Sequence, residues 1–155
     1  MTTNSFVQLV LVDEVRAMQK AGINVHLLAA ITHGIEVCGA FLDPLPYKAK
    51  GQGRKRFNLA IDQLFKTEYN QVNQKLDLYG QLRSHISHSM LPSKYIHLVA
   101  TNRDRHLTIE NRVITLSIAQ LCDDYFDAVA LLLQKMQNGD LKQKRMELEV
   151  LKNIF

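Results

Sequence analysis

The residues best suited to chemistry lie in the middle of the chain, in the segment Leu82–His88. Four residues separate Arg83 from His88, and Pro92 follows soon after. Cleavage of RNA by its own 2′-hydroxyl needs a base for that hydroxyl, an acid for the leaving 5′-oxygen and a cation for the charged transition state. Histidine can fill either of the first two roles, and arginine can fill the third through its bidentate fork. The segment therefore holds the residue types needed to bind and cleave a phosphodiester.

We expect this segment to end a helix that faces the core. Apolar residues recur every three or four positions along it: Leu76, Tyr79, Leu82, Ile86 and Met90. Pro92 should stop the helix near Met90, which places His88 in the last turn, where the negative end of the helix dipole favours the protonated imidazole. Arg83 and His88 lie about 140° apart around a regular helix, so the geometry allows the two side chains to converge but does not enforce it.

At these residues the chain resembles the HEPN family of small α-helical proteins. The mark of that family is an Arg followed at four to six residues by a His on a core helix, and Arg83 and His88 match this spacing. The resemblance also covers the order of elements over most of the chain: two long apolar helices, a basic link, the motif helix and another long helix. One departure is Ser84, because the residue after the Arg is commonly Asn, Asp or His in active members.

The resemblance implies a homodimer in which two motifs meet and form one composite, metal-independent site. Arg83 would bind the scissile phosphate, His88 would act as acid or base, and Ser84 and His85 would contribute to binding. By this reading, residues 1–155 form a single HEPN-like domain that handles RNA or nucleotide phosphates. Its enzymatic form would be an endoribonuclease of a toxin–antitoxin or defence type, with a cognate protein as a further partner. Many members of the family are not nucleases, so the match favours the fold and dimerisation over activity.

The alternative is a catalytically inert helical module for dimerisation or protein interaction. Glu36 lies in an otherwise apolar helical stretch, and a carboxylate in such a place usually needs a cationic partner, which Arg83 could supply. An enzyme needs Arg83 and His88 exposed together in a groove, whereas the inert module can bury Arg83 against Glu36 and direct His88 elsewhere.

A second candidate for binding phosphates is a basic run between the second and third predicted helices. It consists of Lys48, Lys50, Arg54, Lys55 and Arg56, with Gly51 and Gly53 between them. A basic loop that enters a helix N-terminus can hold phosphates through side-chain charge and backbone amides together. The run lacks the Lys-Ser/Thr ending of a P-loop, so the pattern favours a solvated loop over a phosphate site. Arg103 and Arg105 on the predicted hairpin are the next candidates for affinity.

We expect neither a metal nor a cofactor. His85 and His88, and likewise His33 and Glu36, are three residues apart on predicted helices, but neither pair has the Glu-x-x-His order that carboxylate-bridged metal sites in bundles use. Cys38 and Cys122 lie in apolar helical patterns and fit small buried residues of a reducing compartment. We expect His97 and His106 to be structural.

The composition limits the classes of protein to which this chain can belong. The 155 residues, 46% of them apolar, suffice for one domain with a real core. No apolar run approaches the roughly 18 residues of a membrane span, and the N-terminus lacks a secretory pattern, so we expect a cytoplasmic protein that avoids membranes. The net charge of +4 permits an anionic partner without demanding one.

The periodicity predicts a mainly α fold, a bundle of five to six helices with a small β-hairpin or three-strand meander inserted at about residues 95–116, before the penultimate helix. The turns of the insertion should lie near residues 102–105 and 110–111, and residues 68–73 should form a polar joint. The predicted helices span residues 6–20, 24–42, 54–66, 76–90, 118–136 and 141–152.

Overall fold

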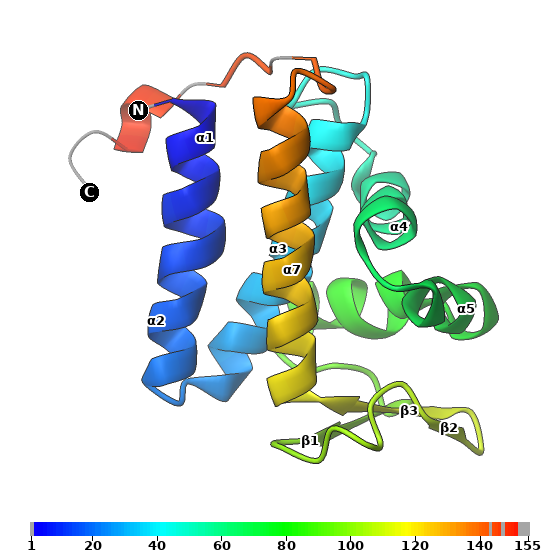
Figure 1. Ribbon diagram of the computed structural model, residues 1–155. Coiled ribbons are helices and arrows are strands. Elements are labelled where there is room, and N and C mark those ends of the chain that lie inside the picture. Colours follow the sequence, from blue (N-terminus) through cyan, green and yellow to red (C-terminus); the bar gives the residue numbers. More distant parts are fainter. Residues whose placement is uncertain (1, 143, 147, 152–155) are drawn as a thin grey trace.

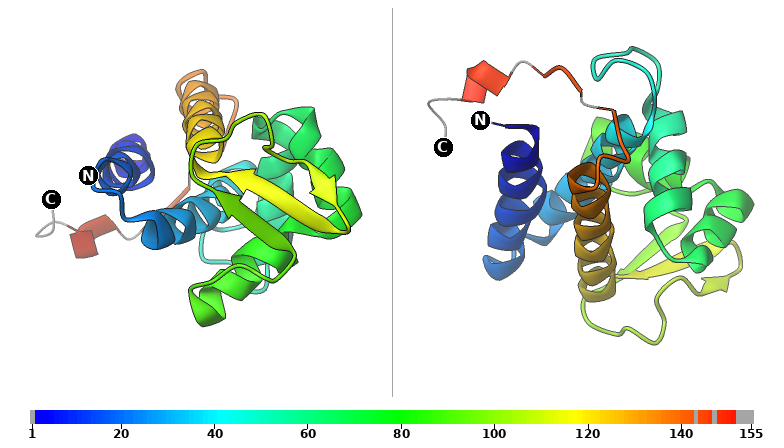
Figure 2. Two further views of the ribbon diagram at one scale, coloured as in Figure 1. Left: turned by 90° about the horizontal axis from the view of Figure 1, so that it is seen from below. Right: turned by 45° about the horizontal axis from the view of Figure 1, so that its top comes forward.

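The computed structural model describes residues 2–142, 144–146 and 148–151. It is mainly helical with a small three-stranded sheet, as the sequence predicts (Figure 1). The N-terminal helical rod, α7 and α3 form upright layers, α4 and α5 pack to one side, and the sheet crosses the lower end of the bundle (Figures 1 and 2).

The N-terminal rod is one continuous helical stretch in three parts. The short helix α1 (Thr3–Phe6) leads into the π-helical segment η1 (Val7–Asp13) and then into α2 (Glu14–Lys20). Gly22 follows with a φ of +68°, the left-handed conformation that glycine adopts without steric cost, and this turns the chain into α3.

The central helix α3 (Asn24–Leu42) has the predicted bounds. Its length and apolar composition would suffice to cross a membrane, but more than half of it is buried inside the fold, as in the core helix of a globular domain. It crosses α4 (Gly53–Leu64) at very close range, because a Cβ atom at Gly39 would lie 1.8 Å from the carbonyl oxygen of Arg56. Glycine at position 39 therefore sets the distance between the two backbones.

The predicted polar joint at residues 68–73 is wrong, because this stretch belongs to helix α5 (Thr67–Leu76). The helix buries only Tyr69 and Val72, so its apolar periodicity is too weak to reveal it in the sequence. Asp77 then adopts the left-handed conformation with a φ of +52° and ends α5.

The single helix predicted for residues 76–90 is divided. The π-helical segment η2 (Tyr79–Ser84) carries Arg83, and the short α6 (His85–Ser89) carries His88. Leu82 and Ile86 are buried as predicted, and Met90 ends α6 with a φ of +61°. Apolar spacing detects the buried side of this stretch but cannot distinguish the wider turn of a π-helix from an α-helix.

The strands are β1 (Ile96–Val99), β2 (Ile109–Glu110) and β3 (Val113–Ser117). Strand β3 lies in the middle, parallel to β1 and antiparallel to β2, so the sheet is mixed and the predicted meander is wrong. The predicted hairpin exists as β2–β3, and its turn is Asn111–Arg112, one residue later than predicted. Both turn residues have positive φ, as in a type I′ turn.

Strand β3 leads directly into α7 (Ile118–Gln137), whose N-terminus is capped by the side chain of Ser117. The helix predicted for residues 141–152 is not formed in its described part. Residues 141–142 and 144–146 are irregular, and a 3-10 turn, η3, spans Leu148–Leu151; the remaining positions of the prediction lie outside the described residues.

Candidate functional site

Arg83 forms an ion pair with Glu36, which lies on α3. Glu36 Oε2 and Arg83 Nε are in direct contact, but the geometry is not that of a hydrogen bond, and both atoms are buried. The two side chains keep 22% and 23% of their surface exposed, so the pair lies at the margin of the core. The structure thus forms the ion pair that the alternative interpretation required.

Ser87 and His33 complete what we call the Arg83 cluster, which comprises His33, Glu36, Arg83 and Ser87. Arg83 Nη1 donates to Ser87 Oγ, and Ser87 Oγ in turn donates to the Arg83 carbonyl oxygen. His33 Nδ1 lies 2.7 Å from the Ala29 carbonyl oxygen and His33 Nε2 lies 3.5 Å from Ser87 Oγ. Among the described residues, Ser87 therefore connects Arg83 to His33, and no such connection leads from Arg83 to His88.

The start of α4 contacts the same cluster. A Cβ atom at Gly53 would lie 3.1 Å from Glu36 Oε1 and 2.9 Å from Tyr79 Oη, so α4 begins against the Glu36 carboxylate. The next residue, Arg54, stacks its guanidinium on the Tyr79 ring and pairs with Asp77. Arg54 of the predicted basic run thus contacts Tyr79, Arg83 pairs with Glu36, and Gly53 lies against both Tyr79 and Glu36.

The other motif residues point to solvent or lie near it. His85 and His88 are exposed on α6, and Ser84 is half-buried. Arg83 and His88 share no hydrogen bond or ion pair in the described part of the chain. The structure therefore brings Arg83 together with Glu36, Ser87 and His33, and leaves His88 open to the surface.

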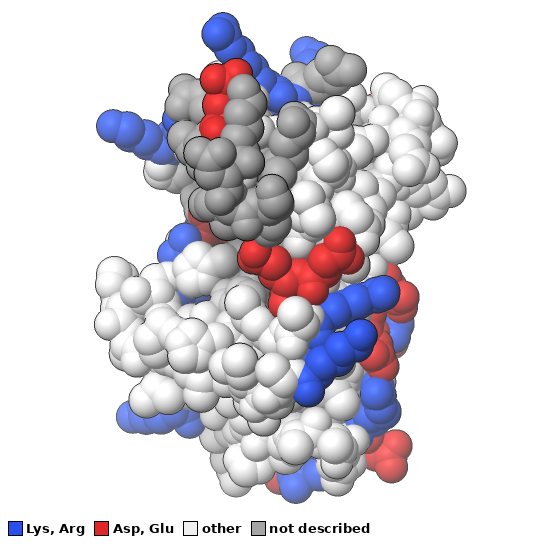
Figure 3. Space-filling view, turned by 90° about the vertical axis from the view of Figure 1, so that its left-hand side faces the viewer, with Lys and Arg blue, Asp and Glu red and all other residues white. Residues whose placement is uncertain are grey.

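The basic run divides into an exposed and a buried part. Lys48, Lys50, Arg54 and Lys55 are exposed. Arg56 is only 6% exposed: it pairs with Asp43 and donates to the carbonyl oxygens of Tyr47 and Pro46, so it fixes the loop and is not part of a basic surface. The face that carries the N-terminal rod is largely uncharged, and acidic and basic side chains lie next to each other near its middle (Figure 3).

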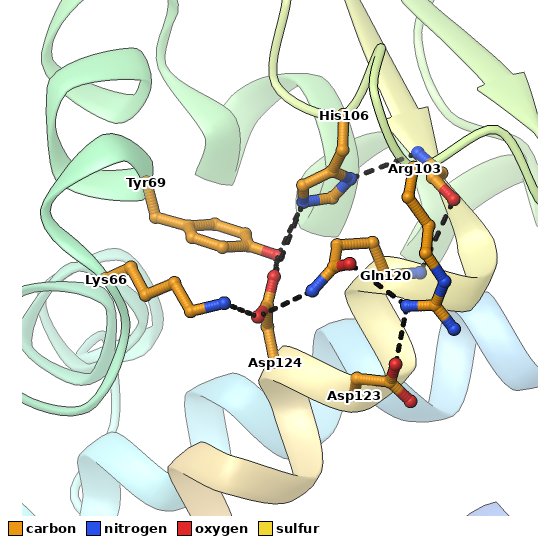
Figure 4. Close-up of polar contacts among 8 residues, drawn as sticks. Lys66, Tyr69, Arg103, His106, Gln120, Asp123 and Asp124 are labelled. Carbon is orange, nitrogen blue, oxygen red and sulfur yellow. Dashed lines mark hydrogen bonds and ion pairs between the residues drawn. The ribbon is translucent and has the colours of Figure 1, made fainter.

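A second polar cluster, which the sequence analysis missed, lies where α5 meets α7 and the loop before β2 (Figure 4). We call it the Asp124 cluster, and it comprises Lys66, Tyr69, His106, Gln120 and Asp124. Asp124 Oδ1 accepts from Lys66 Nζ and from Gln120 Nε2, and Asp124 Oδ2 accepts from the Tyr69 hydroxyl at 2.9 Å. Tyr69 and Asp124 are 2% and 5% exposed, so the bond between these two residues is shielded from water.

The hydrogen bonds of His106 define its tautomer. The Ser117 backbone N–H donates to His106 Nδ1 at 3.1 Å, so that nitrogen carries no proton and Nε2–H donates to the Tyr69 hydroxyl oxygen at 2.8 Å. Burial of the ring lowers the pKa of His106, which keeps the imidazole neutral. Burial, together with the Asp124 charge, raises the pKa of Tyr69, so the phenol stays a donor.

The Lys66 ammonium sits at the edge of this cluster. Its hydrogen bond to Asp124 raises the pKa of Lys66. Arg103 continues the network outwards, because its Nη1 donates to Gln120 Oε1 at 3.0 Å and also pairs with Asp123. Signal for this cluster was present in the sequence: Asp124 interrupts an apolar helical pattern as Glu36 does, although the pattern does not reveal its partners.

Metal ligands do not converge anywhere in residues 2–142, 144–146 and 148–151, where no three His, Cys, Asp or Glu side chains form a group that could hold an ion. Cys38 and Cys122 are buried and unpaired, and burial raises the pKa of their thiols to about 12 and about 11. Both are therefore poor nucleophiles and poor metal ligands at neutral pH.

Comparisons with protein-family models, with curated proteins and with solved structures found no match. The HEPN resemblance therefore stays a hypothesis that depends on the motif and on the order of elements.

Proposed function

We propose that the chain is a HEPN-like homodimeric protein that handles RNA phosphates, and that it cleaves RNA without a metal ion. The observation that carries the proposal is the position of Arg83, whose guanidinium is fixed by Glu36 and Ser87 at the margin of the core and keeps part of its surface open. A fixed, partly desolvated guanidinium is suited to stabilise the charge of a phosphorane-like transition state.

Neighbouring features support the same proposal. Arg83 lies in a π-helical segment, a distortion that is frequent at functional sites. Arg54 and Lys55 are exposed at the start of α4, whose first residue contacts Glu36, so they provide cations for flanking phosphates. His88 directly follows Ser87 of the cluster and is exposed. It does not bond Arg83 of its own copy, and in a composite site it would act as acid or base for the motif of the second copy.

A dimer face next to the motif has support from exposed apolar side chains. Met90, Leu91 and Tyr95 follow α6 and are 43%, 59% and 38% exposed. Large apolar residues exposed close together in sequence are typical of surfaces that are covered in an assembly. This face would place His88 of one copy near the Arg83 cluster of the other.

The test is cleavage of a mixed, end-labelled RNA pool by purified protein in EDTA. We expect products with 2′,3′-cyclic phosphate ends, and we expect His88→Ala to lower the rate by about 100-fold or more, because it removes the acid or base. His88 is exposed, so this variant should fold. His97→Ala changes an equally exposed histidine on β1 and should retain full activity.

The Glu36–Arg83 ion pair also favours a second candidate, the inert helical module. In that case no RNA is cleaved, and the ion pair has a structural role alone. Glu36→Gln and Arg83→Gln should each lower the stability, and the double variant should lose less than the sum, because each single change leaves a partly buried charge without its partner. Cleavage that His88→Ala leaves unchanged would contradict the assignment of His88.

A further inference from the structure

An open cavity of about 480 Å³ lies between α5 and the loop before β2, with the Asp124 cluster as its floor. This volume is within the range of small-molecule sites in proteins. The cavity is separate from the Arg83 cluster and shares none of its residues.

The floor of the cavity is rigid because its polar groups satisfy one another. Asp124 accepts three hydrogen bonds, and both nitrogens of His106 are bonded. A network completed in this way holds its side chains in one arrangement before any ligand arrives. The groups with hydrogen-bonding capacity to spare therefore lie at the rim.

The rim offers mainly donors. Lys66 is 59% exposed and spends one hydrogen bond on Asp124, and Arg103 makes its bonds to described residues with Nη1, so its Nε and Nη2 protons are available. Lys75 adds a third cation to the lining, and Glu68 adds a carboxylate. Cations with unused donors on two sides of one cavity favour an anionic group between them.

Part of the lining is apolar, and we call this part the apolar wall. It consists of Val72 from α5 and of Leu107 and Ile109 from the loop and β2, and Ile109 is 38% exposed. Leu107 has a φ of +61°, a strained conformation for a non-glycine residue, which its N–H bond to the Thr115 carbonyl oxygen helps to hold. The wall therefore presents an apolar surface at the expense of backbone strain.

We infer that this cavity binds a small organic anion, a phosphate ester or a carboxylate, with its charged group between Lys66 and Arg103 and its apolar body against Val72, Leu107 and Ile109. The charged group gains bonds from two cations that are already oriented by Asp124, Gln120 and Asp123. The apolar body covers the exposed part of Ile109.

The test is a titration of ¹⁵N-labelled full-length protein followed by amide chemical shifts. The probes are phenyl phosphate and benzoate, which carry both an anionic group and an apolar ring, and inorganic phosphate and benzyl alcohol, which each carry only one of these. We expect saturable shifts at Val72, Leu107 and Ile109 with at least one of the first two probes, and at least tenfold weaker binding of the last two. The tighter of phenyl phosphate and benzoate identifies the headgroup.

Arg103→Gln provides the decisive variant, and Arg105→Gln is its matched control. Both arginines are about half exposed and each pairs with one carboxylate, but only Arg103 lines the cavity. We expect Arg103→Gln to weaken binding about tenfold or more, as loss of a charged hydrogen bond does, and Arg105→Gln to leave it unchanged. No saturable shift at the cavity, or equal binding by both variants, would overturn the inference, as would inorganic phosphate binding as tightly as phenyl phosphate.

Discussion

At the scale of single residues, the buried polar groups of this protein divide into those with partners and those without. Tyr69 and Tyr125 are both almost fully buried, and burial raises the pKa of both phenols, so both keep their proton. The Tyr69 hydroxyl joins His106 to Asp124, whereas the Tyr125 hydroxyl lies against Gly34 and has no hydrogen-bond partner among the described residues. A buried tyrosine hydroxyl therefore stabilises the fold at position 69 and destabilises it at position 125.

The two phenylalanine substitutions should have opposite signs. Tyr125→Phe removes a buried hydroxyl to which no described residue bonds, and we expect it to raise the free energy of unfolding by about 1 kcal/mol. Tyr69→Phe leaves Asp124 Oδ2 and His106 Nε2–H without a partner, and we expect a loss of about 1–3 kcal/mol. Urea unfolding of both variants checks the prediction, and a destabilised Tyr125→Phe would reveal a partner for that hydroxyl.

Residue-scale reasoning from the sequence succeeded where one buried charge had one obvious counterpart. Glu36 in an apolar helix predicted a cationic partner, and Arg83 is that partner. The same reasoning applied to Asp124 could not have found its partners, because Lys66 and Tyr69 lie at the start of α5 and His106 in the loop before β2. No local pattern encodes how these segments pack on α7. The sequence predicts that Arg56 belongs to a basic surface, and this is wrong because Arg56 is buried in an ion pair with Asp43. Its neighbours in the sequence do not reveal that pair.

At the scale of elements, the distance from a glycine to the backbone of a neighbouring element decides whether that glycine can be replaced. Gly39→Ala places a Cβ atom against the Arg56 carbonyl oxygen, and backbone cannot move aside without separating α3 from α4. We expect this substitution to lower the free energy of unfolding by about 3 kcal/mol or more. Gly80→Ala is the control, because the three atoms nearest to its Cβ would all belong to the Asp77 side chain and none to the backbone. A side chain can rotate away, so we expect a loss below about 1 kcal/mol. Thermal unfolding of both variants tests the difference.

The β2–β3 hairpin provides a prediction of the opposite sign. Asn111 and Arg112 have φ values of +49° and +65°, and the second position of such a turn favours glycine. Arg112→Gly removes the Cβ strain of a left-handed residue, so we expect a gain of about 0.5–1 kcal/mol in unfolding free energy. Arg112→Val, which adds β-branching at the same position, should destabilise the hairpin. If Arg112→Gly were less stable than the parent in urea unfolding, strain at this turn would not be limiting.

Elements were predictable in proportion to the apolar surface that they bury. Helices α3 and α7 bury a side chain in almost every turn, and their predicted bounds agree with the structure to within one residue. Helix α5 buries two residues and was missed, and the π-helical turns of η2 leave no mark in apolar spacing. The parallel pairing of β1 with β3 depends on a crossover through residues 100–108, which strand patterns do not define.

At the scale of the whole molecule, the packing of three regions around the Asp124 cluster depends on the protonation state of the His106 imidazole. His106 accepts from the backbone of Ser117, where β3 becomes α7, and donates to Tyr69 on α5. A proton on Nδ1 would oppose the Ser117 N–H, so the charged ring does not fit the native arrangement. The groups that face the ring are Tyr69, Lys66, Asp124 and Arg103, and burial outweighs the Asp124 charge in lowering the pKa of His106.

A second titrating group works in a lower pH range. Burial alone would raise the pKa of Asp43, but the hydrogen bond from Arg56, the one from the Leu45 backbone N–H and the charges of Arg56 and Lys144 outweigh it and lower that pKa. Asp43 therefore stabilises the fold above the ordinary carboxyl range, near pH 4, and its contribution is lost as the pH falls below that range. Mild acid, between about pH 6.5 and 5, thus separates the effect of His106 from that of Asp43.

Stability should consequently fall as the pH drops below about 6.5. In that range the unfolded chain binds a proton at His106 before the folded chain does, because the folded pKa is the lower of the two, so acid favours unfolding. We expect the free energy of unfolding to decrease by up to about 1.4 kcal/mol per pH unit through this group. His106→Gln should flatten that slope even if it lowers stability at neutral pH, while His97→Gln, a change on the exposed side of β1, should keep it. An unchanged slope in His106→Gln would mean that the imidazole titrates alike in both states, and the closed network at the floor of the cavity would then not exclude the proton.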